Sequence, residues 1–327
     1  MPVYNGSMPL RIERTVKPTL TPFGLHHGDT FQFHLRSGRL WEMTLLATRA
    51  RILARDFNRL HHYHDPGHES GDISAYAFNA DVRINGRHYQ LRRVVGTPES
   101  FYEPAHIDGV CLWFDAAACL FRDAGGFMVE KDWKGGWLCK PAHAARFAVQ
   151  EEGLPICPEP ILPWYPNASA HLDISQCYDG EDCWMGPYNG ASAHCGLDIN
   201  MPKGTILTAP FHLDAHELFH STAAGFNNNR WRGIRRWADG SLWTIQAHHL
   251  IDMLVPERTS LKAGTPYATT AGTAIGLHPH THFMFQITDQ GGQYRLDPWI
   301  LFWATGHSPL CPFKERSPLC IAPDRKK

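Results

Sequence analysis

Two short histidine patterns in the C-terminal half of the chain contain residue types that bind zinc. In His280-Thr-His282 the two imidazoles lie two residues apart, and such residues of a β-strand point to the same face of the sheet. His194-Cys-Gly-Leu-Asp198 adds one nitrogen and one carboxylate oxygen, and Gly196 leaves the backbone room to turn both side chains toward one point. Three protein ligands of this kind leave a fourth position open for water. The two patterns therefore predict a catalytic zinc site.

Each pattern taken alone has a simpler explanation. The chain contains 21 histidines, so a pair two residues apart arises easily by chance, and His278-Pro-His280 overlaps the first pair. An exposed cluster of histidines without a metal is the alternative. The order and the surroundings of the two patterns favour the metal site.

Six segments of the C-terminal half follow one another in an order and at a spacing that are typical of one family. They are His194-Cys-Gly-Leu-Asp-Ile199, Pro202-Lys-Gly-Thr-Ile-Leu-Thr-Ala-Pro210, the hairpin segment from Trp237 to Leu250, the segment from Leu261 to Gly272, His280-Thr-His-Phe-Met284 and Asp297-Pro298. With these segments, from about Gly190 to Trp299, the chain resembles the lysostaphin/LytM-type zinc endopeptidases, which cut peptidoglycan peptides.

The resemblance implies a role for individual residues. His194, Asp198 and His282 correspond to the ligands of one catalytic Zn²⁺, and His280 corresponds to a catalytic histidine beside the metal. The family places a second catalytic histidine directly before a leucine, which here selects His249.

Its neighbour His248 is the competing candidate for that second role. Strand alternation predicts His249 on the face of Trp243, Ile245 and Ala247, and His248 on the opposite face, which does not decide between them.

Three positions depart from the family pattern. Met284 stands where the family usually has Glu, Thr281 replaces a Leu, and Gln246 replaces a Tyr. These changes leave the shape of the groove and the substrate open, while every expected ligand type is present. Three aromatic residues just before His194, namely Tyr178, Trp184 and Tyr188, either line the groove or pack as ordinary loop residues.

The resemblance also implies a mechanism and a substrate. A zinc-activated water would attack a peptide carbonyl, with His249 and His280 exchanging protons or stabilising the oxyanion. The expected partner is a peptidoglycan peptide in the bacterial cell wall, and the expected location is the cell envelope or the extracellular space. A non-catalytic cell-wall-binding relative is the alternative, although such relatives usually lack ligands that this chain retains.

A second zinc pattern competes with the first. His216-Glu-Leu-Phe-His220 matches the HExxH motif, in which two histidines one turn apart on a helix bind zinc and the Glu is the general base. Pro210 lies just upstream and residues 222–229 read as a loop, so little room remains for a helix. In this alternative His216, Glu217 and His220 would form the site of a zincin-type protease.

The elements that position these residues are expected to be mainly strands. We expect an N-terminal tail over residues 1–19, a smaller β-rich domain over 20–150, a proline-rich linker over 151–170, an antiparallel β-sheet peptidase domain over 171–305 and a C-terminal tail over 306–327. Asn85-Gly86 predicts a tight hairpin.

Other parts of the N-terminal half carry weaker signals. Residues 127–130 are expected to form a strand, and residues 140–150 a short helix. Residues 60–69, with four histidines, are read as an exposed loop or as a second metal site. No catalytic motif is visible in this half.

Composition excludes several classes of function. The 31 Lys and Arg residues and 32 Asp and Glu residues give a formal net charge of −1, which provides no electrostatic footprint for nucleic acid. No apolar run is long enough for a membrane span, and residues 1–15 do not read as a secretory signal. The nine cysteines are an odd number, so one thiol at least is unpaired within the chain, while Cys177/Cys183 and Cys311/Cys320 are close enough to form disulfides.

Overall fold

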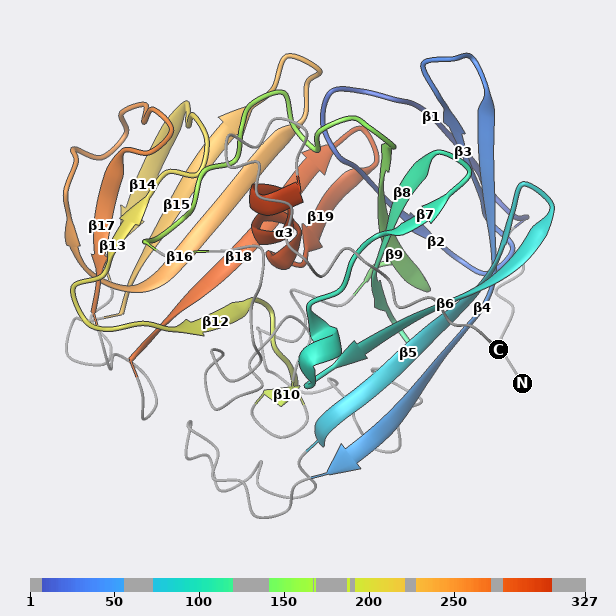
Figure 1. Ribbon diagram of the computed structural model, residues 1–327, viewed down its shortest axis with the longest axis horizontal. Helices are drawn as coiled ribbons and strands as arrows, with labels where there is room; N and C mark the ends of the chain where they lie inside the picture. Colours follow the sequence, from blue (N-terminus) through green and yellow to red (C-terminus); the bar gives the residue numbers. More distant parts are fainter. Residues whose placement is uncertain are drawn as a thin grey trace.

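A computed structural model describes residues 8–55, 73–119, 141–166, 168, 187–188, 192–220, 228–271 and 279–307 of the 327-residue chain. The described elements are almost all strands, paired antiparallel with one exception, which confirms the mainly β fold class. Figure 1 shows the C-terminal sheet at the left and the N-terminal sheets at the right. No helix in these ranges is long and apolar enough to cross a membrane.

The N-terminal half forms two sheets. The larger sheet has the order β1-β3-β4-β5-β6, with β1 (Arg11–Thr15), β3 (Thr30–His34), β4 (Leu40–Arg55), β5 (Ile73–Ile84) and β6 (Arg87–Val95). The smaller sheet has the order β2-β9-β8-β7, with β2 (Thr21–Leu25), β9 (Ala145–Glu151), β8 (Val110–Ala117) and β7 (Ala105–Ile107). A 3₁₀ turn, η2 (Pro98–Ser100), follows β6.

The predicted hairpin at Asn85-Gly86 is confirmed. Ile84 pairs with Arg87, and both turn residues have the positive φ that a two-residue hairpin loop requires, 46° at Asn85 and 81° at Gly86. Such turns favour asparagine and glycine because these residues tolerate the left-handed region. Local turn chemistry was therefore sufficient to place this connection.

Two other expectations for this half were wrong. The segment expected to be a short helix contains β9, which lies between β2 and β8. Nearly every residue of β9 is buried, so the strand lacks the alternation of polar and apolar residues by which sequence reasoning recognises strands. Residues 11–15, which fell in the expected tail, form β1 and pair in parallel with β3. The expected strand at 127–130 and the histidine-rich loop at 60–69 lie outside the described residues.

The C-terminal half is built on one large antiparallel sheet with the order β12-β18-β16-β15-β14. Its strands are β12 (Leu197–Asn200), β18 (His280–Asp289), β16 (Leu242–Met253), β15 (Asn229–Arg236) and β14 (Ala215–Phe219). Further strands extend it, namely β13 (Ile206–Thr208) and β17 (Pro266–Thr270), which pair with each other, and β19 (Gly292–Leu296), which pairs with β18. A short hairpin, β10 (Pro187–Tyr188) and β11 (Ser192–Ala193), precedes β12.

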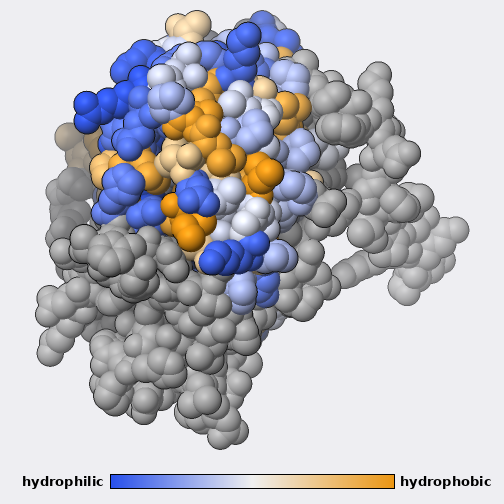
Figure 2. Space-filling model, turned by 90° about the vertical axis from the view of Figure 1, so that its left-hand side faces the viewer, coloured by the Kyte–Doolittle hydropathy of each residue, from blue (hydrophilic) through white to orange (hydrophobic). Residues whose placement is uncertain are grey.

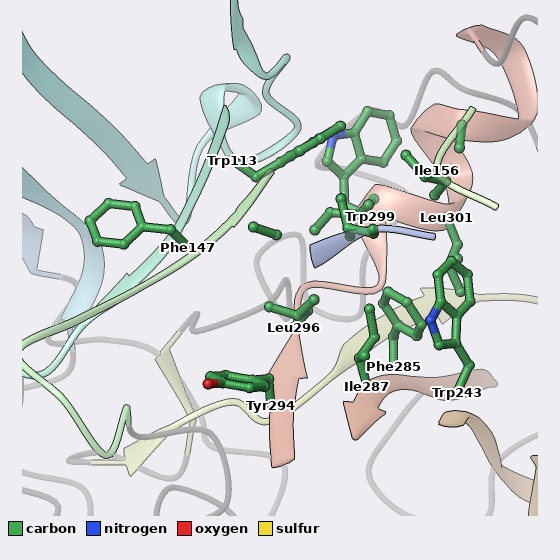
Figure 3. Close-up of a cluster of buried hydrophobic side chains, with 14 of the residues drawn as sticks. Trp113, Phe147, Ile156, Trp243, Phe285, Ile287, Tyr294, Leu296, Trp299 and Leu301 are labelled. Atoms are coloured by element: carbon green, nitrogen blue, oxygen red, sulfur yellow. The ribbon is translucent and has the colours of Figure 1, made fainter. Parts of the chain in front are cut away.

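The two halves share a continuous hydrophobic core. Helix α3 (Trp299–His307) contacts both, since Trp303 packs edge-on against Trp113 of β8 and Phe302 packs against Phe283 of β18. Figure 3 shows side chains of the two halves meeting around Leu296 and Trp299. The sheets of the two halves are separate, but their hydrophobic core is continuous.

A buried network of ion pairs reinforces this junction. Arg93 of β6 donates to Asp297, which follows β19, and also to the Asp115 carbonyl. The Asp115 carboxylate in turn accepts from the Asp297 backbone amide at 2.8 Å and from Arg146 at 2.6 Å. Buried charges are tolerated when they are paired in this way, and removing one partner is strongly destabilising. The halves are therefore expected to fold as one unit.

The proline-rich segment connects the halves but packs as part of the fold. Trp164 is buried and its indole N–H donates to the Tyr267 hydroxyl at 2.9 Å. The Leu162 amide donates to the Pro210 carbonyl, and the Thr208 amide donates to the Trp164 carbonyl. Prolines exclude this segment from a regular sheet, yet its apolar residues fix it against the C-terminal strands.

The end of the molecule formed by β13 and β17 carries a mixed surface. Figure 2 shows hydrophobic patches there, separated by hydrophilic residues. Ile206 of β13 is 43% exposed, and Leu254, which follows β16, is 46% exposed. The candidate site lies on other strands of this sheet, namely β12, β16 and β18.

Candidate metal centre

The three predicted ligands come together at the start of the C-terminal sheet. Asp198 of β12 pairs directly with His282 of β18, and His194 lies just before β12. His282 Nδ1 lies 2.6 Å from Asp198 Oδ1 and 3.1 Å from His194 Nε2, and His194 Nε2 lies 3.4 Å from Asp198 Oδ1. All three side chains are buried. The cluster is the arrangement of ligand atoms that a metal ion would require.

Gly196 makes this close approach possible. A Cβ atom at position 196 would overlap the His282 ring and the Phe283 carbonyl. Any other residue would therefore push β12 away from β18 and separate Asp198 from His282. The glycine in the sequence pattern has a physical reason, which is the space that the facing imidazole occupies.

The donor set and its spacing fit zinc. Two imidazole nitrogens and one carboxylate oxygen are typical zinc ligands, and ligand distances of about 2.0–2.2 Å in a tetrahedron place ligand atoms roughly 3.3 Å apart. Two of the three separations, 3.1 and 3.4 Å, are close to this value. The third, between His282 and Asp198, is a hydrogen-bond distance and would widen slightly around an ion.

The electrostatics of the cluster suit a cation. Burial raises the pKa of Asp198, but the neighbouring His194 and His282 outweigh it and hold this pKa well below the usual value. Burial lowers the pKa of His282, which favours the neutral ring that metal binding requires. The site thus combines an ionised carboxylate with an imidazole that is readily neutral.

Both candidate histidines of β16 reach this cluster, contrary to the alternation predicted for the strand. Arg230 pairs with His248 and Asn229 pairs with Leu250, so His249 is an extra residue in a β-bulge. Its φ of 63° lies in the left-handed region, which turns its side chain away from the core face. The His248 ring stacks on His282 with centroids 4.8 Å apart, and the His249 ring lies 4.6 Å from His280.

His280 completes the group of histidines. Its Nε2 lies 3.5 Å from Asp198 Oδ2, and the ring is buried. Because His280 and His282 are two residues apart on β18, they share a face as predicted, while Phe283 and Phe285 pack in the core. His280 and His249 therefore lie beside the cluster on adjacent strands.

Asn228 orients the His249 ring, and sequence reasoning missed it. The His249 Nδ1–H donates to Asn228 Oδ1 at 2.7 Å, which leaves Nε2 as the nitrogen with a lone pair. Asn228 is buried and follows directly on residue 227 in a run of three asparagines. Nothing in that run distinguishes one asparagine from the next, so no sequence signal was available.

The histidines of β16 are held neutral by their surroundings. Burial is the main cause that lowers the pKa of His248 and of His249 well below the usual value. The neighbouring rings add to this effect, His282 for His248 and His280 for His249. Neutral imidazoles can accept a proton, which is the state that a general base needs.

Comparison with solved structures finds proteins of the family that the sequence patterns resemble. The catalytic domain of the antimicrobial peptidase lysostaphin from Staphylococcus simulans matches at 24% identity over 33% of this chain and 77% of that chain, with a TM-score of 0.27. A longer lysostaphin structure from the same organism matches at 20% identity over 41% of this chain and 50% of that chain, with a TM-score of 0.29.

A third structure matches most of the chain. This candidate M23 peptidase from Pseudomonas aeruginosa is similar over 88% of this chain and 95% of that chain, at 14% identity and a TM-score of 0.29. No family model matches the sequence, and no curated protein does. These likenesses are distant and show the fold alone.

The competing HExxH pattern does not form a helix. Residues Ala215–Phe219 are strand β14, on which residues four apart lie roughly 13 Å from each other. His216 is buried among its own partners, with Nδ1 accepting from Trp231 and Nε2 lying 2.9 Å from the Pro256 carbonyl. Glu217 pairs with Arg232 at 2.7 Å. His220, just after β14, is exposed and lies 3.9 Å from Glu257. The zincin alternative is therefore wrong, since a strand separates the two histidines that a helical turn would bring together.

Several other residues that the sequence singles out lie outside the described part of the chain. Tyr178 and Trp184 are among them, as are the pairs Cys177/Cys183 and Cys311/Cys320. Tyr188 belongs to β10, but its side chain is not described. Among the described cysteines, Cys111, Cys157 and Cys195 are free thiols.

Proposed function

We propose that this protein is a zinc-dependent endopeptidase that hydrolyses peptide bonds in bacterial peptidoglycan. The observation that carries the proposal is the buried cluster of His194, Asp198 and His282, with His249 and His280 beside it. The resemblance of six ordered segments to the lysostaphin/LytM-type endopeptidases supports the same reading. His194, Asp198 and His282 are the proposed ligands of a single zinc ion.

In this proposal the histidines beside the metal have different catalytic roles. When bound, zinc would act as a Lewis acid and lower the pKa of a coordinated water to about 7. His249 Nε2 is available to accept a proton, because Nδ1–H is engaged by Asn228. In this proposal His280, whose ring lies beside that of His249 on the neighbouring strand, would donate a hydrogen bond to a developing oxyanion or a proton to the leaving amine.

The substrate and the location follow from the resemblance of the sequence segments. The proposed substrate is the peptide part of peptidoglycan, either a stem peptide or a cross-bridge, and the proposed location is the cell envelope or the extracellular space. The two-histidine scheme needs no Glu general base, and the cluster of described ligands contains no Glu.

Metal analysis combined with a hydrolysis assay tests this function. The full chain is the right material, because the core and the Arg93–Asp115–Asp297 network join the two halves. We expect one zinc per chain, and the release of peptide amines from purified peptidoglycan that stops on chelation and returns with zinc. A protein that binds zinc and releases no amine would be the non-catalytic cell-wall-binding relative. A protein that binds no stoichiometric metal would contradict the ligand assignment.

A further inference from the structure

Arg230 lies on the same face of the sheet as the proposed metal ligands. It is directly opposite His248 in the pairing of β15 with β16, while its neighbour Trp231 pairs with Ala247 and packs in the core. Directly opposed residues have Cβ atoms about 4.5–5.5 Å apart. An arginine side chain at this position is long enough to bring its guanidinium over the strand that carries His248 and His249.

Arg230 is separated from the cluster by a single side chain. His248, which it faces across the strand pair, stacks on the proposed ligand His282 with ring centroids 4.8 Å apart. The guanidinium is therefore within reach of a peptide bound at the cluster.

A second arginine on the same face provides the contrast. Arg232, two residues along β15, pairs with Glu217 at 2.7 Å and lies 5.1 Å from the centre of the Phe219 ring. Arg230 is exposed and makes no ion pair with any acid in the described ranges. One guanidinium is neutralised within the sheet, and the other remains available for an anion.

We propose that Arg230 is a specificity residue that binds a carboxylate of the peptide substrate, so that the preferred substrate is an anionic peptide. This inference rests on the proposed function and narrows its substrate class. A guanidinium forms two parallel hydrogen bonds with a carboxylate, a geometry that an amide of the same shape cannot match. Strand β15 lies two strands from β18, or about 10 Å at roughly 4.8 Å per strand, and an extended peptide advances about 3.3 Å per residue. The carboxylate therefore lies within about three residues of the bond that is cut.

Matched peptides that differ only in charge test the proposal. The probes are oligoglycine peptides in which one residue flanking the central bond is Glu or Gln, and a second pair with a free or an amidated C-terminus. The first pair reports a side-chain carboxylate and the second a terminal carboxylate. We expect the zinc-loaded full chain to favour the acidic member of one pair about 10-fold in kcat/KM, in line with a hydrogen bond to a charged group.

Variants then assign that preference to a residue. Arg230→Gln should reduce the kcat/KM of the acidic peptide to that of the neutral one. Arg230→Glu should reverse the preference, so that the neutral peptide is cut faster. Arg232→Gln is the control and should keep the discrimination, because its guanidinium is already occupied by Glu217. An unchanged preference in Arg230→Gln, or an equal loss for both peptides, would overturn the proposal.

A binding measurement separates this inference from the proposed function. Calorimetry with the same peptides, N-methylated at the central amide so that they are not cut, gives the ratio of Kd values without turnover. If the wild-type chain binds the acidic member more tightly through Arg230 but releases no amine from peptidoglycan, the proposed activity fails and the inference stands. If binding does not distinguish the two members, the inference fails.

Discussion

Two histidine-containing regions of the same sheet look alike in sequence and differ completely in structure. The HExxH segment has two histidines and a glutamate within five residues, yet it follows strand β14 and not a helix, and His216, Glu217 and His220 each have a separate partner. The ligands of the candidate metal centre come from segments 84 residues apart and meet because β12 pairs with β18 in one register. Closeness in sequence therefore counts for less than strand pairing in assembling a metal site.

The largest expected effect separates the two regions by metal content. His282→Ala should lose the zinc and lower activity by several orders of magnitude, because it removes one of three protein ligands. His216→Ala should keep the zinc, although the loss of its buried hydrogen bonds should lower stability by about 1–3 kcal/mol. Elemental analysis and thermal unfolding of the two variants check this. Zinc retained in His282→Ala would contradict the assignment of His282 as a ligand.

A second pair of variants compares the two histidines of the bulge. His249→Ala should lower kcat by on the order of 10²–10⁴-fold with zinc retained, as is typical for a positioned acid–base or oxyanion group. His248→Ala should change the rate only a few-fold, because His248 stacks on the proposed ligand His282, whereas His249 is the histidine that lies beside His280. Steady-state kinetics, with the zinc content measured for both variants, distinguish the two roles. An inactive His248→Ala together with an active His249→Ala would show that His248 is the catalytic histidine.

A third comparison concerns the two asparagines before β15 and at its start. Asn228→Leu should lower kcat by about 10- to 100-fold with little change in KM, since groups that orient a functional histidine typically contribute this much. Asn228→Asp keeps an acceptor for the Nδ1–H and should retain most activity. Asn229→Leu is the control, because the Asn229 side-chain amide donates to the Ile251 carbonyl.

Nitrogen NMR of the His249 ring adds a readout that does not depend on turnover. The Nδ1-protonated form should dominate in the wild-type chain and in Asn228→Asp, and should lose its dominance in Asn228→Leu. The same tautomer in all three proteins would show that Asn228 does not set it.

The smallest expected effect is on the HExxH side. Glu217→Ala should keep most of the activity, because its carboxylate pairs with Arg232 on the next strand and lies in no catalytic position. This pair is partly exposed, so its loss should cost about 0–1 kcal/mol of stability. A loss of several orders of magnitude in activity with zinc retained would restore Glu217 as a general base and reverse the ranking of the two regions.

Local signals in the sequence were reliable where they depended on a few adjacent residues. The Asn85-Gly86 turn and the shared face of His280 and His282 follow from backbone geometry within a short window. The need for Gly196 does not, because the space at this position is taken by the His282 ring of a distant strand. Strand β9 was missed because both its faces are covered, which removes the alternation that reveals a strand. The packing of Trp164 was missed because proline content indicates only what a segment cannot form.

The amino-acid sequence by itself determined the mainly β class, the order of the family-like segments and the choice of His194, Asp198 and His282 as a candidate ligand set. Only the tertiary structure decided that HExxH lies on a strand, that a bulge at His249 turns two consecutive histidines toward the same cluster, and that Asn228 orients one of them. Residue types and short spacings can be read directly from the sequence. Register shifts and contacts between distant segments depend on how all the strands pack together, since no local pattern encodes which partner a strand or a side chain will find.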